Sequence, residues 1–190
     1  RLESKMVIDA EGCASTLLRQ MALSTFDRTR IVNAVQGEAA NVKDVESDIV
    51  EVYLGQMYAP GLFAWMIPRR DGSSKVGLAT RAGNARECLK TLLRVHPVAR
   101  RKLGFRSVKN LSYHLIPLGG TLPKTYHNGF LAVGDVASQV KPTTGGGVIM
   151  GLTCARIAGE TAHQAVLADD FSEKFLSRYQ DGCKREIGFD

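Results

Sequence analysis

The sequence has no long apolar run and few residues of the kinds that form metal sites or disulfides. No apolar stretch approaches the length of a bilayer span, and the N-terminus lacks the pattern of a signal peptide. The four cysteines, Cys13, Cys88, Cys154 and Cys183, are widely scattered, unlike the paired ligands of a zinc site. We therefore expect a cytoplasmic protein with reduced cysteines and no metal.

Common nucleotide-binding and hydrolase motifs are also missing. No Gly-x-Gly-x-x-Gly occurs in the 190 residues, and no glycine-rich stretch ends in Gly-Lys-Ser/Thr, which argues against an NTPase phosphate loop. The sequence offers no Ser-His-Asp order, no His or Cys cluster at metal spacing and no spaced carboxylate pair. Hydrolysis is therefore not indicated.

The composition provides enough apolar material for a sizeable core. Hydrophobic residues make up 44% of the chain, and the length allows one domain or two small ones. The net charge of +6 suggests an acidic partner, but the cations are dispersed and no nucleic-acid-binding module is present, so we do not expect nucleic acid. The densest basic cluster, which follows a predicted helix over 85–95, comprises Arg94, His96, Arg100, Arg101, Lys102 and Arg106. It fits a rim for an anionic headgroup or leaflet, or simply a solvated helix end.

Residues 134–147 have the features of a cofactor-binding segment. The apolar run 130–133 ends at Gly134-Asp135, so a buried strand would deliver a carboxylate at its carboxyl end, where open α/β sheets hold ligands. The turn that follows consists of Pro142, Thr143, Thr144, Gly145, Gly146 and Gly147, and a helix-compatible run starts at Val148. Such a turn can place backbone N–H groups at a helix N-terminus, where they bind an anion or dipole. A glycine-rich turn that only packs a helix on a sheet is the alternative.

A second stretch, residues 6–20, has the same pattern. A short apolar run ends at Asp9, Glu11 and Gly12, and Ser15 precedes a predicted helix that carries Arg19. Cys13 opens this region, where a thiolate would be stabilised, although a lone cysteine is more commonly a small buried apolar residue.

Together the two stretches resemble the glutathione-reductase-like flavin-dependent oxidoreductases, in the branch of aromatic hydroxylases and geranylgeranyl reductases. In that branch the first motif supports the cofactor site, and the later Gly-Asp binds the ribose of FAD. The resemblance implies FAD as the cofactor. The cofactor-binding residues that it implies are Asp9, Glu11, Gly12, Ser15, Arg19, Gly134 and Asp135, with the turn from Pro142 to Val148.

Two segments narrow the resemblance to archaeal-type geranylgeranyl reductases. Residues 141–147 look like that family's form of the loop, and residues 60–68 resemble its substrate-side Tyr-x-Trp-x-Phe-Pro segment, with Phe63 and Ile67 replacing the Tyr and the Phe. The substrate-binding residues implied are Tyr58, Phe63, Trp65 and Pro68. In the family a Gly-x-Gly-x-x-Gly unit lies upstream of the first motif, so this chain resembles the C-terminal portion of a longer flavoprotein. We expect it not to hold FAD alone, and to leave Ile8 and Val133 without the strands that would cover them.

Between the two motifs the sequence changes to short strands. The runs at 31–42, 49–58, 62–67, 75–79 and 112–117 are separated by turn signals and predict an inserted antiparallel sheet. With one face covered by helices and the other over a flavin, this sheet would form a substrate cavity. Residues 148–167 and 171–187 predict two helices, with Asp169 and Asp170 as candidate caps of the second.

The expected fold is therefore mixed α/β (α+β), with a partial three-layer FAD-binding domain and an inserted antiparallel-sheet substrate domain. The FAD-binding part would comprise residues 1–25 and 125–168, and the substrate domain residues 26–124. A C-terminal helix would occupy residues 169–190. The boundaries follow from the change in strand pattern.

The resemblance implies a flavin-dependent oxidoreductase that reduces carbon–carbon double bonds of isoprenoid (geranylgeranyl) chains, on lipids or prenyl diphosphates. Electrons would come from NAD(P)H, ferredoxin or another reductant, and a lipid substrate would bring the protein to the inner face of the membrane as a peripheral contact. N–H groups at the start of the helix from Val148 would stabilise negative charge on a reduced flavin. The proton donor stays open among Tyr53, Tyr58, His114 and Cys13. A flavin monooxygenase of the same fold and a non-catalytic interaction module are the alternatives.

Overall fold

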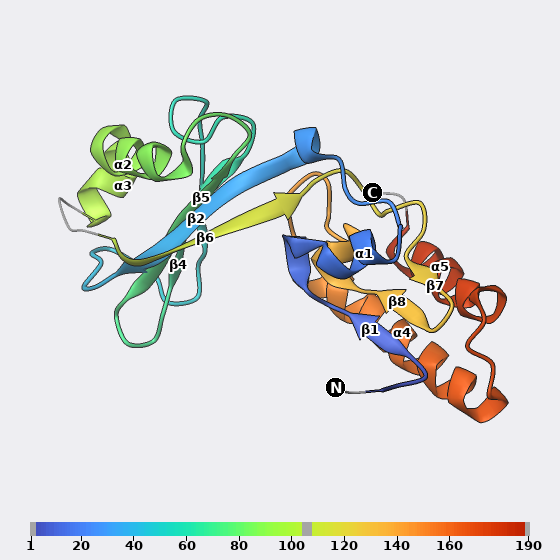
Figure 1. Cartoon of the computed structure of the whole chain (residues 1–190). Helices are drawn as coiled ribbons and strands as arrows, with labels where there is room; N and C mark the ends of the chain where they lie inside the picture. The colour runs from blue at the N-terminus through green and yellow to red at the C-terminus, as the bar shows by residue number, and fades with distance from the viewer. Residues whose placement is uncertain (1–2, 104–107, 189–190) are drawn as a thin grey trace. The chain divides into compact units, whose positions relative to one another are not determined.

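The computed structural model describes residues 3–103 and 108–188, and these form two compact units (Figure 1). Unit 1 comprises the described residues up to Ile31 and from Ile116 onward, and unit 2 comprises Val32–Leu115. The fold is mixed α/β with an antiparallel sheet, as the sequence predicts. The division lies several residues inside the boundaries expected at 26 and 124, since Leu118 donates its N–H to the carbonyl of Arg30 at 2.9 Å and ties both segments into unit 1.

Unit 1 contains a three-stranded sheet of order β1-β8-β7. Strand β1 (Val7–Asp9) pairs in parallel with β8 (Phe130–Ala132), and β8 pairs antiparallel with β7 (Tyr126–His127). The prediction that the strands before the two motifs share one sheet is thus confirmed. Because parallel strands end at the same edge, Asp9 and the Gly134-Asp135 turn follow neighbouring strand ends. Short helices continue each motif, namely η1 (Gly12–Ala14), α1 (Thr16–Gln20) and η3 (Gly134–Ala137), and η2 (Arg28–Arg30) ends the first segment.

The solvent exposure of apolar residues differs between β1 and the residue that follows β8. On β1, Val7 and Ile8 are 43% and 46% exposed, as expected for Ile8. The same expectation for Val133 is wrong, because Val133 is only 6% exposed and packs in a cluster with residues of the two long helices of unit 1. These helices are α4 (Val148–Ala168) and α5 (Glu173–Ile187).

The start of α5 differs from the predicted one. Ser172 is the cap, because its hydroxyl accepts the N–H of Phe175 at 3.2 Å. Asp169 instead ends α4 in a left-handed conformation with φ of 46°, and Asp170 accepts the N–H of Ser172. A serine two residues further on therefore performs the capping that the aspartates were expected to perform.

Unit 2 is built on a five-stranded sheet of order β3-β4-β5-β2-β6. Its strands are β2 (Ile31–Ala39), β3 (Glu51–Leu54), β4 (Phe63–Pro68), β5 (Ser74–Thr80) and β6 (Lys109–Pro117). The β2–β5, β4–β5 and β3–β4 pairs are antiparallel, which confirms the predicted inserted sheet.

Two helices, α2 (Ala85–Val95) and α3 (Pro97–Leu103), cover one face of this sheet (Figure 1). Asn84 caps α2 by accepting the N–H groups of Arg86 and Glu87, and buried Leu89 and Leu92 pack in the same core as the sheet residues. The predicted basic cluster lies largely on α2 and α3, and Arg106 lies outside the described residues. No helix in the described part of the chain is long and apolar enough to cross a bilayer.

Candidate functional site

The carboxyl end of β1 presents a buried carboxylate that lacks a full set of partners. Asp9 is 2% exposed, and its Oδ1 accepts the N–H of Glu11 at 3.0 Å. Its Oδ2 is buried and has no hydrogen-bond partner among the described residues, and burial raises the pKa of this carboxyl. A buried acceptor without a donor destabilises the fold. The unpaired carboxylate oxygen of Asp9 therefore lowers the stability of the fold.

The rest of the first motif forms a tight turn. Gly12 and Ser15 have positive φ angles of 68° and 53°, and the Ser15 hydroxyl is buried without a partner among the described residues. Glu11 accepts the N–H of Leu17 at 2.8 Å, and the Arg19 guanidinium donates to the Ala14 carbonyl at 3.0 Å. Glu11 and Arg19 thus stabilise the turn itself, whereas Asp9 and Ser15 carry the unpaired polar atoms.

The second motif places the Asp135 carboxylate beside the start of α4. A Cβ on Gly147 would lie 3.1 Å from Asp135 Oδ1, so glycine leaves room for that carboxylate. Gly134 has φ of 81°, and its N–H donates to Gln139 Oε1 at 2.8 Å. An open cavity of about 430 Å³ lies here, and it is lined by Ile116, Asp135, Gly145, Gly147, Val148, Gly151 and Leu152.

Backbone hydrogen bonds within the glycine turn hold it together before α4 begins. The Gly145 N–H donates to the Lys141 carbonyl at 2.9 Å, and the Lys141 N–H donates to the Gly146 carbonyl at 3.1 Å. Helix α4 has no side-chain hydrogen bond at its N-cap, Gly147. The first N–H groups of a helix have no intrahelical acceptor and carry partial positive charge, so this end can hold an anion or the negative end of a dipole.

The structure does not bring every residue of the turn to the Asp135 cavity. Thr143, Thr144 and Gly146 are exposed, and Pro142 lines a separate cavity of about 230 Å³ together with Cys183 and Lys184. Of the predicted turn residues, Gly145, Gly147 and Val148 line the cavity with Asp135.

Cys13 lies near this carboxylate but is not a stabilised thiolate. Burial and the negative charge of Asp135 raise the pKa of the Cys13 thiol to about 11. Of the two interpretations of Cys13, the small apolar residue is favoured over the stabilised thiolate, because the nearby charge is negative and disfavours ionisation.

Two of the four predicted substrate residues, Phe63 and Trp65, lie on the same side of the unit 2 sheet. Ala64 and Met66 of β4 are fully buried in the helix-covered core, so Phe63 and Trp65 lie on the opposite face. The two rings are 6.1 Å apart at 67°, and the Trp65 indole N–H donates to Gln36 Oε1 at 3.1 Å. A Cβ on Gly77 would lie 2.7 Å from the indole, so this position needs glycine.

Two more apolar side chains share the face that carries Trp65. Val52 is opposite Trp65 and Leu54 is opposite Phe63 in the antiparallel β3–β4 pair, and residues directly opposite each other point to the same side. Val52 and Leu54 are 54% and 75% exposed. Pro68 ends β4 and is half-buried, but it has the register of Ala64 and Met66, so the prediction that it lies with Trp65 is wrong. We call Phe63, Trp65, Val52 and Leu54 the open face.

Tyr58 is not part of the open face. It is 7% exposed, its hydroxyl donates to the Leu54 carbonyl at 2.6 Å, and its ring packs against His96 in the helix-covered core. Tyr53 lies in the same core and donates to Glu51 at 2.7 Å, and burial raises its pKa. The structure thus separates both tyrosines from Trp65. His114 is exposed on β6 and lines a different cavity, of about 280 Å³.

Comparisons with known proteins agree with the predicted resemblance. Residues 30–102 match the family model described as the geranylgeranyl reductase catalytic domain. The chain is 35% identical to digeranylgeranylglycerophospholipid reductase 2 of Methanothermobacter thermautotrophicus and 34% identical to digeranylgeranylglycerophospholipid reductase 2 of Methanopyrus kandleri, in each case over 98% of this chain and 48% of the relative. The resemblance to the geranylgeranyl reductase family is confirmed. The chain spans about half the length of the curated relatives it matches.

Solved structures show the same fold. A geranylgeranyl bacteriochlorophyll reductase-like protein from Thermoplasma acidophilum superposes with a TM-score of 0.87 at 26% identity, over 96% of this chain and 47% of that one. A flavin-dependent brominase superposes with a TM-score of 0.74 at 15% identity, over 96% of this chain and 49% of that one, which shows a shared fold alone. Among the described residues, no group of three or more His, Cys, Asp or Glu side chains could hold a metal ion.

Two residues near the site were not predicted. Gln139 and Tyr179 form buried hydrogen bonds to the backbone around Gly134. Tyr179 is fully buried on α5, and the sequence carries no information on where its hydroxyl points. The sequence carries no signal for the role of Gln139, because the positive φ of Gly134 is visible only in the structure.

Proposed function

We propose that the protein containing this chain is a flavin-dependent oxidoreductase that reduces carbon–carbon double bonds in isoprenoid (geranylgeranyl) chains of lipids or prenyl diphosphates. The names of its relatives support the reaction and the substrate class. The observation that carries the proposal is that the Asp135 carboxylate and the uncapped start of α4 line one cavity. A carboxylate and a helix N-terminus side by side suit a ligand with both hydroxyl groups and an electron-rich ring.

The residues present fit FAD as the cofactor. Asp135 would accept hydrogen bonds from the ribose, and Gly147 keeps the space beside its Oδ1 clear of a side chain. The unpaired, buried Asp9 Oδ2 and Ser15 hydroxyl are further polar atoms for which the described residues provide no partner. A flavin bound here would supply the hydride for the double bond. The N–H groups of the first turn of α4 would stabilise negative charge that develops nearby, without rearrangement of the helix.

The open face of unit 2 suits an isoprenoid chain. Phe63, Trp65, Val52 and Leu54 give a continuous apolar surface over two paired strands. The Trp65–Gln36 hydrogen bond fixes the indole orientation, so the ring offers a defined wall rather than a mobile one. We propose that this surface binds the hydrocarbon chain of the substrate, with no contribution from Tyr58 or from Pro68, which has the register of the buried residues of β4.

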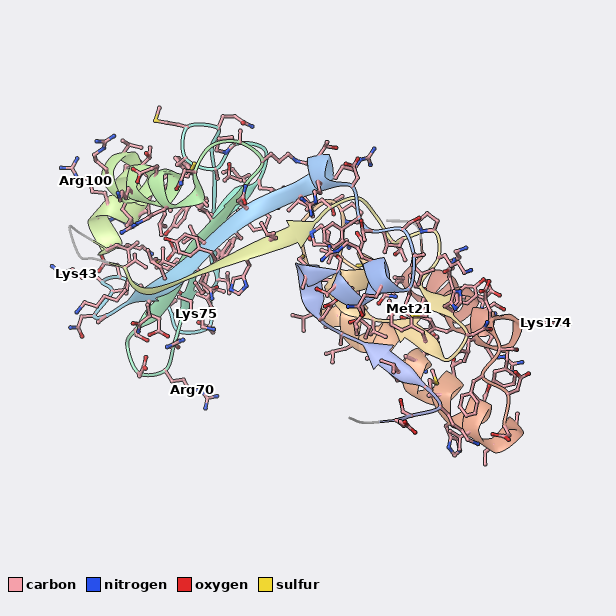
Figure 2. The ribbon with its side chains drawn as sticks, in the orientation of Figure 1. Met21, Lys43, Arg70, Lys75, Arg100 and Lys174 are labelled. Carbon is pink, nitrogen blue, oxygen red and sulfur yellow. The ribbon has the colours of Figure 1, made fainter. Side chains whose placement is uncertain are left out.

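The charge distribution supports an anionic substrate headgroup or membrane surface. The positive excess of the chain lies entirely in residues 32–115, because the remaining residues contain equal numbers of cations and anions. Figure 2 shows the side chains of Lys43, Arg70 and Arg100 extending outward from unit 2. We propose a peripheral contact with the inner face of the membrane through this unit, and NAD(P)H, ferredoxin or another reductant as the electron donor.

Anaerobic incubation of the intact protein with FAD, dithionite and a geranylgeranyl lipid tests the function. The expected product gains two mass units for every double bond that is reduced. A flavin monooxygenase is the second candidate, since the flavin-dependent brominase shows that this fold is shared with enzymes of other flavin chemistry. Oxygen incorporated into the lipid in air, with no reduced product under nitrogen, would favour that candidate, and no product in either condition would leave a non-catalytic role.

A further inference from the structure

Helix α5 contributes two adjacent buried side chains to the end of the unit 1 sheet. Tyr179 is fully buried, and its hydroxyl donates to the Ala132 carbonyl at 2.7 Å. Gln180 is 5% exposed, and its Oε1 accepts the N–H of Thr125 at 2.9 Å. Tyr179 therefore bonds to the backbone at the end of β8, and Gln180 bonds to the backbone just before β7.

These contacts replace a hydrogen bond of the sheet. The Ala132 N–H donates to the Thr125 carbonyl at 2.8 Å, which is one half of the pair of bonds that an antiparallel ladder would form there. The second half would join the Thr125 N–H to the Ala132 carbonyl, but these two groups bond instead to Gln180 and Tyr179. Helix α5 thus ends the β7–β8 ladder one residue before the Val133-Gly134 turn.

A third buried residue, Gln139, extends this network to the loop that carries Asp135. Gln139 is fully buried, and its amide donates to the Tyr179 oxygen at 2.8 Å. Its Oε1 accepts the Gly134 N–H at 2.8 Å. Hydrogen bonds from Tyr179 and Gln139 therefore hold the peptide groups on both sides of Val133.

The loop needs such support because its backbone is in sparsely populated conformations. Gly134 and Ser138 have φ angles of 81° and 54°, and residues in such conformations persist when their surroundings over-determine them. The Ser138 N–H donates to the Asp135 carbonyl at 2.9 Å, so the orientation of Asp135 depends on the same turn. A fully satisfied buried network specifies one geometry.

We propose that Tyr179 and Gln139 are positioning residues that hold the Asp135 carboxylate in its cofactor-binding orientation. The proposal rests on the proposed function, in which Asp135 binds FAD. Tyr179 acts through its hydroxyl as a donor to Ala132 and an acceptor from Gln139, and it does not touch the ligand cavity. Burial raises the pKa of this hydroxyl above its ordinary value, so the hydroxyl is protonated and can donate at neutral pH.

Gln180 provides a matched control on the same helix. It is also buried, and it makes hydrogen bonds to Thr125 and to the Pro123 carbonyl, the latter at 2.6 Å. None of the hydrogen bonds of Gln180 involves Gly134 or Gln139. Gln180→Leu should therefore weaken folding as Tyr179→Phe does, while it leaves the Asp135 loop in place.

The test measures the Kd for FAD by flavin fluorescence, together with the Tm without flavin, on the intact wild-type protein and four variants. These variants are Tyr179→Phe, Gln139→Met, Gln180→Leu and Asp135→Ala. We expect Tyr179→Phe and Gln139→Met to raise the Kd about tenfold, at the low end of the loss seen when outer-shell partners of a bound metal are removed, and Gln180→Leu to leave it within about twofold at a similar loss of Tm.

Each outcome decides one of the two proposals. A Kd that rises equally in Gln180→Leu and Tyr179→Phe would overturn the positioning role, because the effect would then follow fold stability. An unchanged Kd in both Tyr179→Phe and Gln139→Met would overturn it as well, provided that Asp135→Ala weakens binding. A wild-type protein that does not bind FAD, or an Asp135→Ala variant with wild-type affinity, would instead contradict the proposed cofactor site. If Tyr179→Phe does not fold, Gln139→Met alone decides between these outcomes.

Discussion

The two units differ in how they treat polar groups. Unit 1 has balanced charge and concentrates buried polar atoms, including Asp9 and Gln139, around the ends of β1 and β8. Unit 2 carries the positive excess and presents an apolar face on which the Trp65 indole donates a hydrogen bond to Gln36. Fixed polar groups around a small cavity suit a ligand whose orientation matters, and a broad apolar surface suits a flexible hydrocarbon chain. This difference supports the proposal that unit 1 binds the cofactor and unit 2 binds the substrate.

Asp135→Ala should produce the largest loss of FAD affinity, and it tests the proposed cofactor site of unit 1. Two charge-assisted hydrogen bonds to the ribose, at about 1.5–3 kcal/mol each, would be lost, so FAD affinity should fall by at least about a hundredfold. The carboxylate is only half-buried, so the Tm without flavin should change little. Flavin content after purification and a fluorescence titration measure the loss. A variant that retains the wild-type flavin ratio would refute the role of Asp135.

Gly147→Ala should weaken FAD binding by about tenfold, because the new Cβ would lie 3.1 Å from Asp135 Oδ1 and displace the carboxylate. Gly159→Ala on the same helix is the control, since no atom lies within 4 Å of the added Cβ. That control should raise the Tm through helix propensity and leave FAD affinity unchanged. Equal Kd values in both variants would show that the space beside Asp135 is not used.

Sequence patterns predicted the strands and the turn that carry the candidate residues, because these elements depend on local signals. An apolar run followed by Gly-Asp predicts a strand and its terminal carboxylate, and alternation in β4 separates Ala64 and Met66 from Phe63 and Trp65. The resemblance to a known family supplied the chemistry. The sequence could not predict that Tyr58 points into the core, since it precedes β4 in a turn with no strand register to follow.

Long-range contacts account for what else the sequence could not predict. The environment of Cys13 depends on Asp135, far away along the chain, and a negative charge there disfavours the thiolate. Val133 was expected to lack cover, but residues of α4 and α5 pack in the same cluster. Sequence periodicity reports which face of an element is apolar, and it does not report which distant element covers that face.

Trp65→Leu should weaken substrate binding and leave FAD binding unchanged. Loss of the aromatic surface should raise the KM for a geranylgeranyl lipid by about tenfold, since a large side chain contributes about 1.5–3 kcal/mol when it is buried against a ligand. FAD affinity should stay at the wild-type value. Tyr113→Leu, at an exposed aromatic position of β6, is the control for a general effect on the sheet. A change in flavin Kd in Trp65→Leu would contradict the division between the units.

The smallest expected effect is on the alkylation of Cys13, whose pH dependence responds to the negative charge of Asp135. Its pKa is raised to about 11, so the thiol is neutral at pH 7 and the reactive thiolate appears only as the pH approaches that value. The rate of alkylation by iodoacetamide should therefore rise about tenfold per pH unit between pH 7 and 10. Asp135→Ala removes one cause of the raised pKa, so its pH profile should shift to lower pH. A wild-type rate that levels off below pH 9 would contradict the assigned environment.

A crystal structure of the intact protein with FAD bound tests the central claim most directly. The account predicts ribose hydroxyl groups within hydrogen-bond distance of the Asp135 carboxylate and the electron-rich edge of the flavin ring at the N–H groups of the first turn of α4. A flavin bound elsewhere, with Asp135 and the start of α4 in contact with solvent, would contradict it.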